Sequence, residues 1–300
     1  MTDTRTDALD PAAATRAAFR FSWTWLGVVP FFAFALFFLI LPSVYLVVGA
    51  FQNPAGQFTF ANIVELFSRP ILVQAYWNSI QLSGLTAIVG GVVGFAIAYA
   101  VTLGGLPRWI RPALMTFSGV ASQFAGVPLA FAFLATLGRT GLITVLSIQY
   151  FGFNPYSAGF NLLTFSGLIL TYLYFQIPLM VLIITPALDG LKKEWREASE
   201  ILGASFGQYW RYVAFPVLWP SLLGASLLLF ANAFGAVATA FALTGPQLNI
   251  ATIQLFAQIR GDALHNPNLG YALAFGMIVI TGLSNGAYIW LRSRSERWLR

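Results

Sequence analysis

Side chains that could do chemistry are few in this chain of 300 residues. It has no cysteine, which excludes disulfides, thiolate nucleophiles and cysteine-based metal sites. Its one histidine, His265, lies near Asp262 in the stretch RGDALHNPNLG, and a metal site needs more ligands than these two. No G-x-x-x-x-G-K-[ST] motif for cradling phosphates occurs. We therefore expect no catalytic residue, no metal site and no cofactor on this chain.

Charge is concentrated in one stretch, EWREASEILGASFGQYWRYVAFPVLWPSL, which begins at Glu194. The polar segment is much longer than the roughly two to eight residues that suffice to connect two helices. Within it, apolar residues recur at helical spacing opposite the charged ones, which predicts a first amphipathic helix. These apolar residues are Trp195, Ala198, Ile201 and Leu202.

A second short helix is predicted after a turn at Gly203. Ser205, followed three residues later by Gln208, predicts a capping box at its start. We expect this helix to end at Pro216, where the next apolar segment begins. Its apolar stripe comprises Phe206, Tyr209, Trp210 and Val213. Something must cover the two apolar faces: the membrane surface, the chain's own membrane spans, or a groove on another protein.

The elements around this segment are strongly apolar. Only 9% of residues are charged and 58% are hydrophobic, whereas a soluble domain has about 25% charged residues. The mean hydropathy is +0.75. We therefore predict an all-α integral membrane protein with six transmembrane helices, because a span needs about 20 apolar residues. The expected spans are 24–50, 79–103, 112–137, 162–187, 213–243 and 269–291.

The fifth stretch is longer than one span requires, so a tilted or broken helix is expected there. We divide the chain into a tail at 1–23, one transmembrane domain at 24–291 with the charged loop at 188–212, and a basic tail at 292–300. With the N-terminus inside, all Lys and Arg lie on the cytoplasmic side except three, Arg69, Arg139 and Arg260. This bias predicts that both termini are cytoplasmic, and it explains the basic C-terminus without nucleic-acid binding.

Two outer segments are apolar but too interrupted to span a membrane. The segment 138–160, broken by glycines and Pro155, is expected to form a short interfacial helix and a loop. The loop after the first span has a short amphipathic piece around Ile63, Leu66 and Phe67. Each could be a docking surface, although interfacial packing is the favoured interpretation.

Polar residues inside the expected spans are the candidates for a translocation path. No Asp, Glu, Lys or Arg lies in the central part of any expected span, which disfavours a carrier driven by an ion gradient. Buried amides can also simply hold helices together. The candidates for solute contact are Gln123, Gln176, Asn232 and Tyr172.

The charged loop resembles the EAA motif of bacterial ABC importer permeases. The family pattern is Glu-Ala-Ala, three residues, Gly, nine residues and Ile-x-Leu-Pro, on the cytoplasmic loop before the penultimate span. The matching positions are Glu197, Ala198, Ser199, Gly203, Val213, Phe215 and Pro216. Ser199, Val213 and Phe215 depart from it conservatively. The second span, which begins at Asn78 and ends with Ala-Tyr at Tyr99, is similar to that of the family.

This resemblance implies a type I importer permease, multi-pass in the bacterial inner membrane and not itself an enzyme. It implies a second permease, the same or different, two cytoplasmic ATPases that hold ATP and Mg, and an extracytoplasmic solute-binding protein. The loop would seat in a groove of the ATPase. There Glu197 would be the anchor, Ala198 and Ser199 would allow close approach, and Gly203 would form the turn. Ser205 would cap the second helix and Pro216 would begin the span.

The sequence leaves the solute open. The general run of the chain is similar to permeases for polyamines, phosphonates and ferric ion, and a sugar is the runner-up. From other classes, an ion-gradient-driven secondary carrier and a membrane scaffold without transport also remain as alternatives. Association with an ATPase would distinguish an importer permease from the secondary carrier and from the scaffold.

Overall fold

A computed structural model of the chain describes residues 24–260 and 267–296. It contains two compact units, residues 1–46 and 47–300, which are described separately. Its described part contains helices and no β-strand, which confirms the predicted all-α fold. The α-helices are α1 (Thr24–Phe34), α2 (Leu41–Ala50), α3 (Ala61–Ser68), α4 (Pro70–Leu103), α5 (Ile110–Gln123), α6 (Val127–Leu137), α7 (Leu142–Phe151), α8 (Phe165–Asp189), α9 (Lys193–Ile201), α10 (Phe206–Tyr209), α11 (Phe215–Gly235), α12 (Val237–Thr244), α13 (Ala251–Arg260) and α14 (Pro267–Glu296).

Six helical segments of the described chain are long and apolar enough to cross a membrane, as predicted. They are Gly27–Ala50, Pro70–Leu103, Val127–Phe151, Phe165–Asp189, Phe206–Gly235 and Pro267–Leu291. The expected tail at 1–23 and the pair His265 and Asp262 lie outside the described residues. The helix of the sixth span, α14, continues through Glu296, beyond the expected end of that span at residue 291.

The first unit is helical from Thr24 onward, with a π-helical turn at Ala35–Ile40 between α1 and α2. This turn ends two residues before Pro42. Proline lacks the N–H that an α-helix needs and its ring collides with the carbonyl four residues earlier. A wider turn relieves this collision, so the helix continues past the proline.

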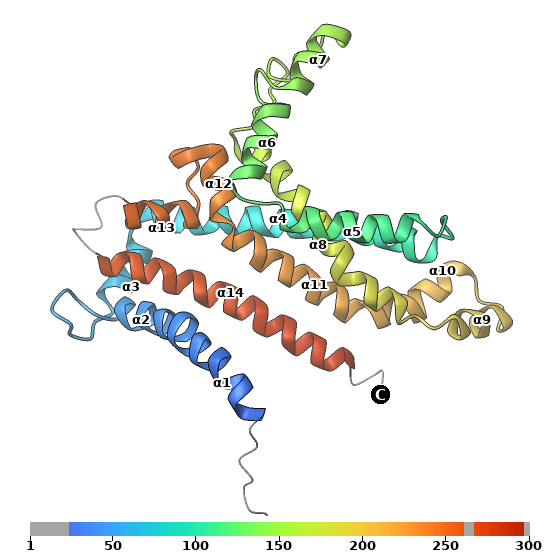
Figure 1. Ribbon diagram of the computed structural model, residues 1–300, viewed down its shortest axis with the longest axis horizontal. Helices are drawn as coiled ribbons and strands as arrows, with labels where there is room; N and C mark the ends of the chain where they lie inside the picture. Colours follow the sequence, from blue (N-terminus) through green and yellow to red (C-terminus); the bar gives the residue numbers. More distant parts are fainter. Residues whose placement is uncertain (1–23, 261–266, 297–300) are drawn as a thin grey trace, which may run out of the picture. The chain divides into compact units, whose positions relative to one another are not determined.

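The second unit is a bundle in which α4 packs against α8 and α11, and α11 packs against α14. Figure 1 shows these helices running alongside one another, with α9 and α10 at one end of the bundle and α3 and α13 at the other. The helix α5 packs along α8. The charged loop is thus carried directly on the ends of two central helices, α8 and α11.

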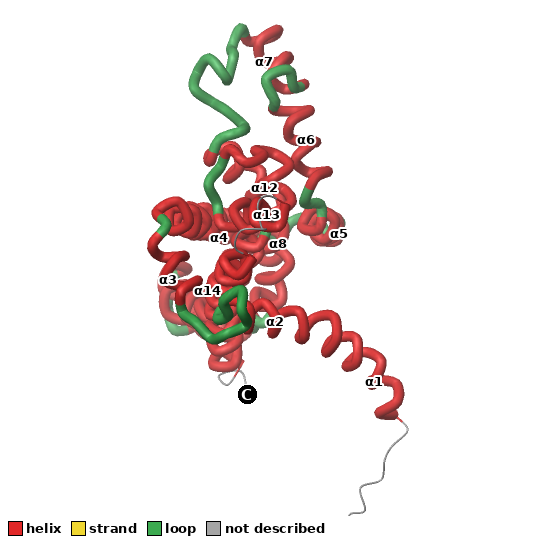
Figure 2. Tube along the Cα trace, turned by 90° about the vertical axis from the view of Figure 1, so that its left-hand side faces the viewer, coloured by secondary structure: helices red, strands yellow, loops and turns green. Residues whose placement is uncertain are grey.

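The segment from α6 to α7 runs across the bundle. Both views show it projecting away from α4, α8 and α14, with α12 beside the base of α6 (Figures 1 and 2). The prediction of one continuous span at 112–137 was therefore wrong. The helix α5 ends at Gln123, and α6 starts in a new direction at Val127. The predicted short helix within 138–160 is present as α7, although residues 127–151 together also meet the criteria of length and apolarity for a span.

The fifth predicted span is broken, as expected, but the short helix before it was predicted wrongly. The helix does not end at Pro216. A π-helical turn at Trp210–Ala214 lies two residues before that proline, and helical structure continues from Phe206 to Gly235. The break falls at Ala236, between α11 and α12.

Candidate functional site

The first helix of the charged loop is α9, and it ends in the predicted glycine turn. Glu194 lies in the first turn of the helix, where its charge suits the helix dipole. Gly203 has a φ of 76°, in the left-handed region that L side chains rarely adopt. Its N–H donates to the carbonyl of Glu200 at 3.0 Å, and Ala204 N–H donates to that of Ser199 at 2.9 Å. The left-handed residue thus lets the chain satisfy the carbonyls at the end of α9.

The second helix starts with the predicted capping box. The backbone N–H of Ser205 donates to the side-chain oxygen of Gln208 at 2.7 Å. In return, the Gln208 N–H donates to the Ser205 hydroxyl at 3.4 Å. The box thus satisfies two of the free donors at this helix start. The loop is therefore a defined helix, turn and helix.

The two apolar faces of the loop differ in how far they are buried. Tyr209 is buried, and Trp210 and Val213 pack with it against Leu188 and Leu191 near the end of α8. The chain's own helix ends therefore cover Tyr209, Trp210 and Val213 of the second helix, whereas Phe206 stays exposed. On the first helix, Trp195 joins the same cluster as a partly buried residue.

The far end of α9 is not covered. Ile201 and Leu202 are each 86% exposed, although both are large and apolar. Phe206, at the start of α10, is 58% exposed. Exposed apolar groups that gather on a charged loop indicate a protein or membrane contact. We call Ile201, Leu202 and Phe206 the apolar tip.

Charged side chains lie along α9. Arg196 Nε donates to Glu200 Oε1 at 2.9 Å, and this hydrogen bond, followed by the charge of Glu200, raises the pKa of Arg196. Lys192 Nζ lies 5.9 Å from the centre of the Trp195 ring. Glu197 is exposed and forms no ion pair with the described residues. Its carboxylate remains open to a cation from elsewhere.

The two small positions after Glu197 lie on α9 as well. Ala198 is exposed, and the Ser199 hydroxyl donates to the carbonyl of Arg196 at 2.7 Å. Behind α9 lies a cavity of about 470 Å³ between the loop and the end of α4. Glu197 contributes to its rim, together with residues that include Tyr99, Lys193, Arg196, Glu200 and Trp210.

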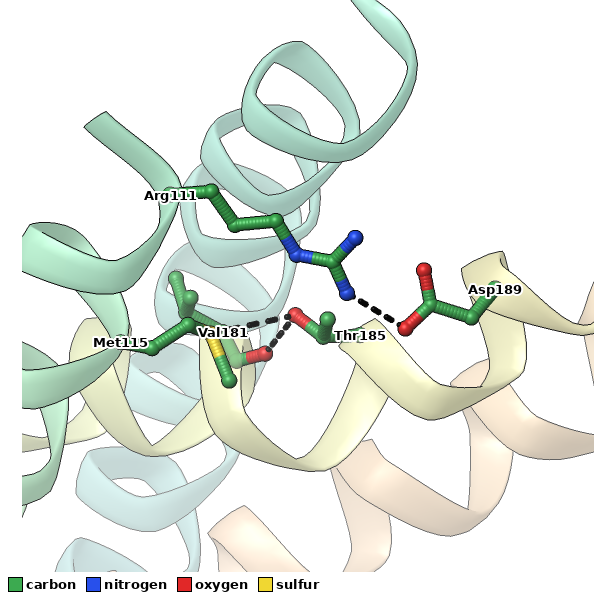
Figure 3. A network of polar contacts seen from close by, with 5 residues as sticks. All are labelled: Arg111, Met115, Val181, Thr185 and Asp189. Atoms are coloured by element: carbon green, nitrogen blue, oxygen red, sulfur yellow. Dashed lines mark hydrogen bonds and ion pairs between the residues drawn. The ribbon is translucent and has the colours of Figure 1, made fainter. Parts of the chain in front are cut away.

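An ion pair ties the base of the loop to α5. Arg111 Nη2 lies 2.6 Å from Asp189 Oδ2, at the last residue of α8 (Figure 3). One turn earlier on α8, the Thr185 hydroxyl donates to the carbonyl of Val181 at 2.6 Å and lies 3.8 Å from the sulfur of Met115 on α5. The sequence did not single out this pair, because its partners are far apart in the chain.

Three of the four solute-path candidates lie together where α8 meets α11. Gln176 is fully buried, and its Nε2 donates to the carbonyl of Leu229 at 2.8 Å. Asn232 is exposed, and its Nδ2 lies 3.5 Å from Gln176 Oε1. The buried Tyr172 hydroxyl donates to the carbonyl of Ala236, at the break after α11. Gln176 and Tyr172 thus hold helices together in this conformation, and the exposed Asn232 amide donates to Gln176.

The fourth candidate, Gln123, is exposed and ends α5. It adjoins a break whose Gly126 N–H donates to the hydroxyl of Thr239 on α12 at 2.7 Å. The two helix breaks, after α5 and after α11, are therefore linked to each other. Thr239 was missed from the sequence, although the glycine and Pro128 on either side of Val127 were a usable signal for the break.

Comparison with known families decides what kind of protein carries this loop. Residues 90–300 match the family described as binding-protein-dependent transport system inner membrane component. The chain belongs to this family. The match includes the charged loop and the helices on either side of it, which agrees with the resemblance seen in the EAA pattern and with a multi-pass protein of the inner membrane.

Several curated permeases of this kind are similar in sequence. A ferric transport system permease of Actinobacillus pleuropneumoniae is 28% identical over 268 residues, which cover 86% of this chain and 37% of the relative. The chain therefore spans about two fifths of that protein's length. A spermidine/putrescine transport system permease of Haemophilus influenzae is 24% identical over 86% of this chain and 90% of its own length.

Solved structures share the fold of this chain. A bacterial ABC transporter that imports the acidic polysaccharide alginate matches with a TM-score of 0.68 and 16% identity, over 91% of this chain and 95% of that one. The methionine ABC transporter MetNI in an inward-facing form matches with a TM-score of 0.51 and 17% identity, over 74% and 95% of the two chains. At these identities, the likeness concerns the fold.

Proposed function

We propose that this chain is the membrane permease of an ATP-driven importer. It forms the translocation path for a small solute that an extracytoplasmic binding protein delivers, and its loop at 188–212 couples the path to cytoplasmic ATPase subunits. The observation that carries the proposal is the apolar tip on a rigid, charged loop in a chain of this family. The MetNI and alginate transporters, which share the fold, are ABC transporters.

The geometry of the loop suits the transmission of force. The cap at Ser205 and the turn at Gly203 fix the two helices relative to each other. The buried face at Tyr209 joins them to the ends of α8 and α11. A partner that grips the apolar tip and Glu197 would therefore move the spans with the loop, as a rigid element must when two domains close.

The translocation path in this proposal runs by the two linked helix breaks. Broken helices mark the solute sites of many transporters, because their free backbone groups and nearby polar side chains can meet the solute. Gln123, at the end of α5, and the exposed Asn232, near the end of α11, supply amides close to these breaks. Neither break contains Asp, Glu, Lys or Arg, so polar contacts with a solute there would come from backbone groups and amides.

We propose that the solute is a polyamine, a phosphonate or ferric ion, because the relatives named above are ferric and spermidine/putrescine permeases. Relatives named for sulfate and for trehalose are also similar. Uptake into proteoliposomes from a panel of these solutes, with the cognate binding protein, tests the class. Uptake of trehalose alone would overturn it in favour of the sugar alternative.

The role of the loop can be tested by isolating the chain from its native membrane in mild detergent. We expect an ATPase subunit to copurify. Replacing the apolar tip by Ile201→Glu and Leu202→Glu should abolish this association while leaving the permease in the membrane, because the charged groups cannot be buried in a groove.

The matched control is the pair Ile201→Met and Leu202→Met, which keeps the tip apolar and should retain the ATPase. Loss of the ATPase from both pairs would indicate a loop that no longer folds. Retention of the ATPase by the glutamate pair would contradict the proposed docking surface, and the absence of any ATPase from the unaltered protein would favour a scaffold.

A further inference from the structure

A second hollow in the structure lies far from the charged loop, where α3 meets α4 and α14. It has a volume of about 310 Å³. The residues that line it include Ile63, Phe67, Val73, Ile80, Phe275 and Val279. Two of these belong to the amphipathic piece for which the sequence left docking and packing as alternatives. We call this hollow the α3 groove.

The floor of the α3 groove is a built feature of the fold. The Tyr76 hydroxyl donates to the carbonyl of Leu273 on α14 at 2.5 Å. Its ring can lie there only because residue 276 is glycine: a Cβ at Gly276 would come within 2.6 Å of the Tyr76 oxygen. The Tyr76 hydroxyl is the one polar side-chain group among the described lining residues. Its hydrogen bond directs it toward the backbone of α14.

Water is a poor occupant for such a space. An ordered water needs two to four polar partners, and the walls of the α3 groove offer apolar side chains. An empty space of this size would cost the lining its van der Waals contacts. The groove therefore calls for an apolar occupant.

The surroundings indicate which apolar occupant it is. Both α4 and α14 are membrane-spanning candidates. The groove opens onto a surface that is already apolar, with Phe67 72%, Val73 43% and Val279 39% exposed. In a membrane protein such a surface is continuous with the hydrocarbon of the bilayer. Flexible acyl chains are the apolar material present there at high concentration.

We propose that the α3 groove binds one acyl chain of a phospholipid, in the leaflet on the α3 side of the membrane. The acyl chain lies over Tyr76 and is held between Phe67 of α3 and Val279 of α14. Contact is by van der Waals packing, since lipid tails are as apolar as the groove itself. The bound lipid would join the short helix α3 to the last span.

The proposal is tested with the full chain in nanodiscs that contain a phospholipid with a photoactivatable diazirine on its acyl chain. After illumination, adducts are mapped by mass spectrometry. We expect them to be enriched several-fold on the groove residues relative to Leu283, which lies on α14 outside the groove and is 71% exposed. Equal labelling of both regions would overturn the proposal.

A filled groove provides the second arm. Val73→Trp should reduce the groove adducts several-fold and leave those on Leu283 unchanged. Val92→Trp, at a site on α4 that is 66% exposed and outside the groove, is the matched control and should leave both unchanged. Undiminished groove adducts in Val73→Trp would contradict the assignment.

Another occupant would show itself separately. Because the chain has no cysteine, a disulfide between Val73→Cys and Phe37→Cys would report the first helix in the groove. The same disulfide formed only between copies would report a second permease. High yield of either crosslink in lipid, together with few groove adducts, would show that the first helix or a second permease occupies the groove in place of the acyl chain.

Discussion

At Gly203 a single backbone angle shapes the charged loop. With a φ of 76°, this residue turns the chain from α9 toward α10. No other atom lies within 4 Å of the position that a Cβ would take, so a side chain here meets strain and no steric clash. A substitution here therefore acts through the backbone conformation and not through a steric clash.

We predict that Gly203→Ala costs about 1 kcal/mol in the local stability of the loop, because an L residue disfavours this conformation. Hydrogen exchange of residues 190–216 should rise. Gly203→Asn should have a smaller effect, since asparagine tolerates the left-handed region better. Equal exchange in Gly203→Ala and the unaltered chain would refute the role of the turn.

Glu197 carries the second prediction at this scale. Its exposed carboxylate has no ion-pair partner among the described residues, so its charge is available to the ATPase partner that we propose. Glu197→Lys should leave expression intact and abolish ATP hydrolysis stimulated by solute and binding protein. Gly203→Asp should do the same. Unimpaired transport by both variants would contradict the coupling role.

Residue patterns predicted the local features of the loop well. The capping box of Ser205 and Gln208 and the turn at Gly203 depend on neighbours within a few residues, and such contacts can be read from spacing. The hydrogen bonds of Gln176 and Tyr172 to α11 and to the break after it could not be read, because their partners are more than fifty residues away.

At the scale of elements, Pro216 was one source of error. Pro216 was expected to end a helix, but the π-helical turn at Trp210–Ala214 accommodates it. The turn at Ala35–Ile40 stands in the same relation to Pro42. Because the helix is continuous from α10 into α11, the charged loop is joined rigidly to a membrane span. The proline thus lies within the connection between loop and span.

The ion pair between Arg111 and Asp189 is the second joint between elements, and it ties α5 to the base of the loop (Figure 3). Both side chains are 43% exposed, so we expect a coupling energy of only about 0.2–1 kcal/mol in a double-mutant cycle. Arg111→Asp should lower thermal stability and transport, and adding Asp189→Arg should restore part of both.

A cycle in which the two substitutions are simply additive would show that the pair does not act as a joint. Met115→Leu is a suitable control on the same face of α5, because it keeps the apolar contact near Thr185. It should leave the cycle energy unchanged.

For the whole molecule, composition and length predicted the class and the number of membrane-spanning segments. They did not predict that α6 and α7 run across the bundle (Figure 2). That direction follows from the break at residues 124–126 and from packing on α12, a contact between segments about one hundred residues apart. Hydropathy reports how apolar a segment is, and carries no information on its direction.

The predicted orientation can be measured directly, because the chain lacks cysteine. A membrane-impermeant maleimide should label Ser157→Cys in intact cells, since this exposed residue follows α7 on the predicted outer side. Lys193→Cys, on the charged loop, should react only after the membrane is permeabilised. The reverse pattern would place the loop outside, where it could not meet a cytoplasmic ATPase.

Transport in a defined system tests the central claim most directly. The permease, its ATPase and its binding protein are reconstituted in proteoliposomes, and uptake of labelled solute is measured with either ATP on the loop side or an imposed proton or sodium gradient. We expect uptake with ATP alone, and background uptake in Glu197→Lys. Uptake driven by the ion gradient without ATP, and unaffected by Glu197→Lys, would contradict it.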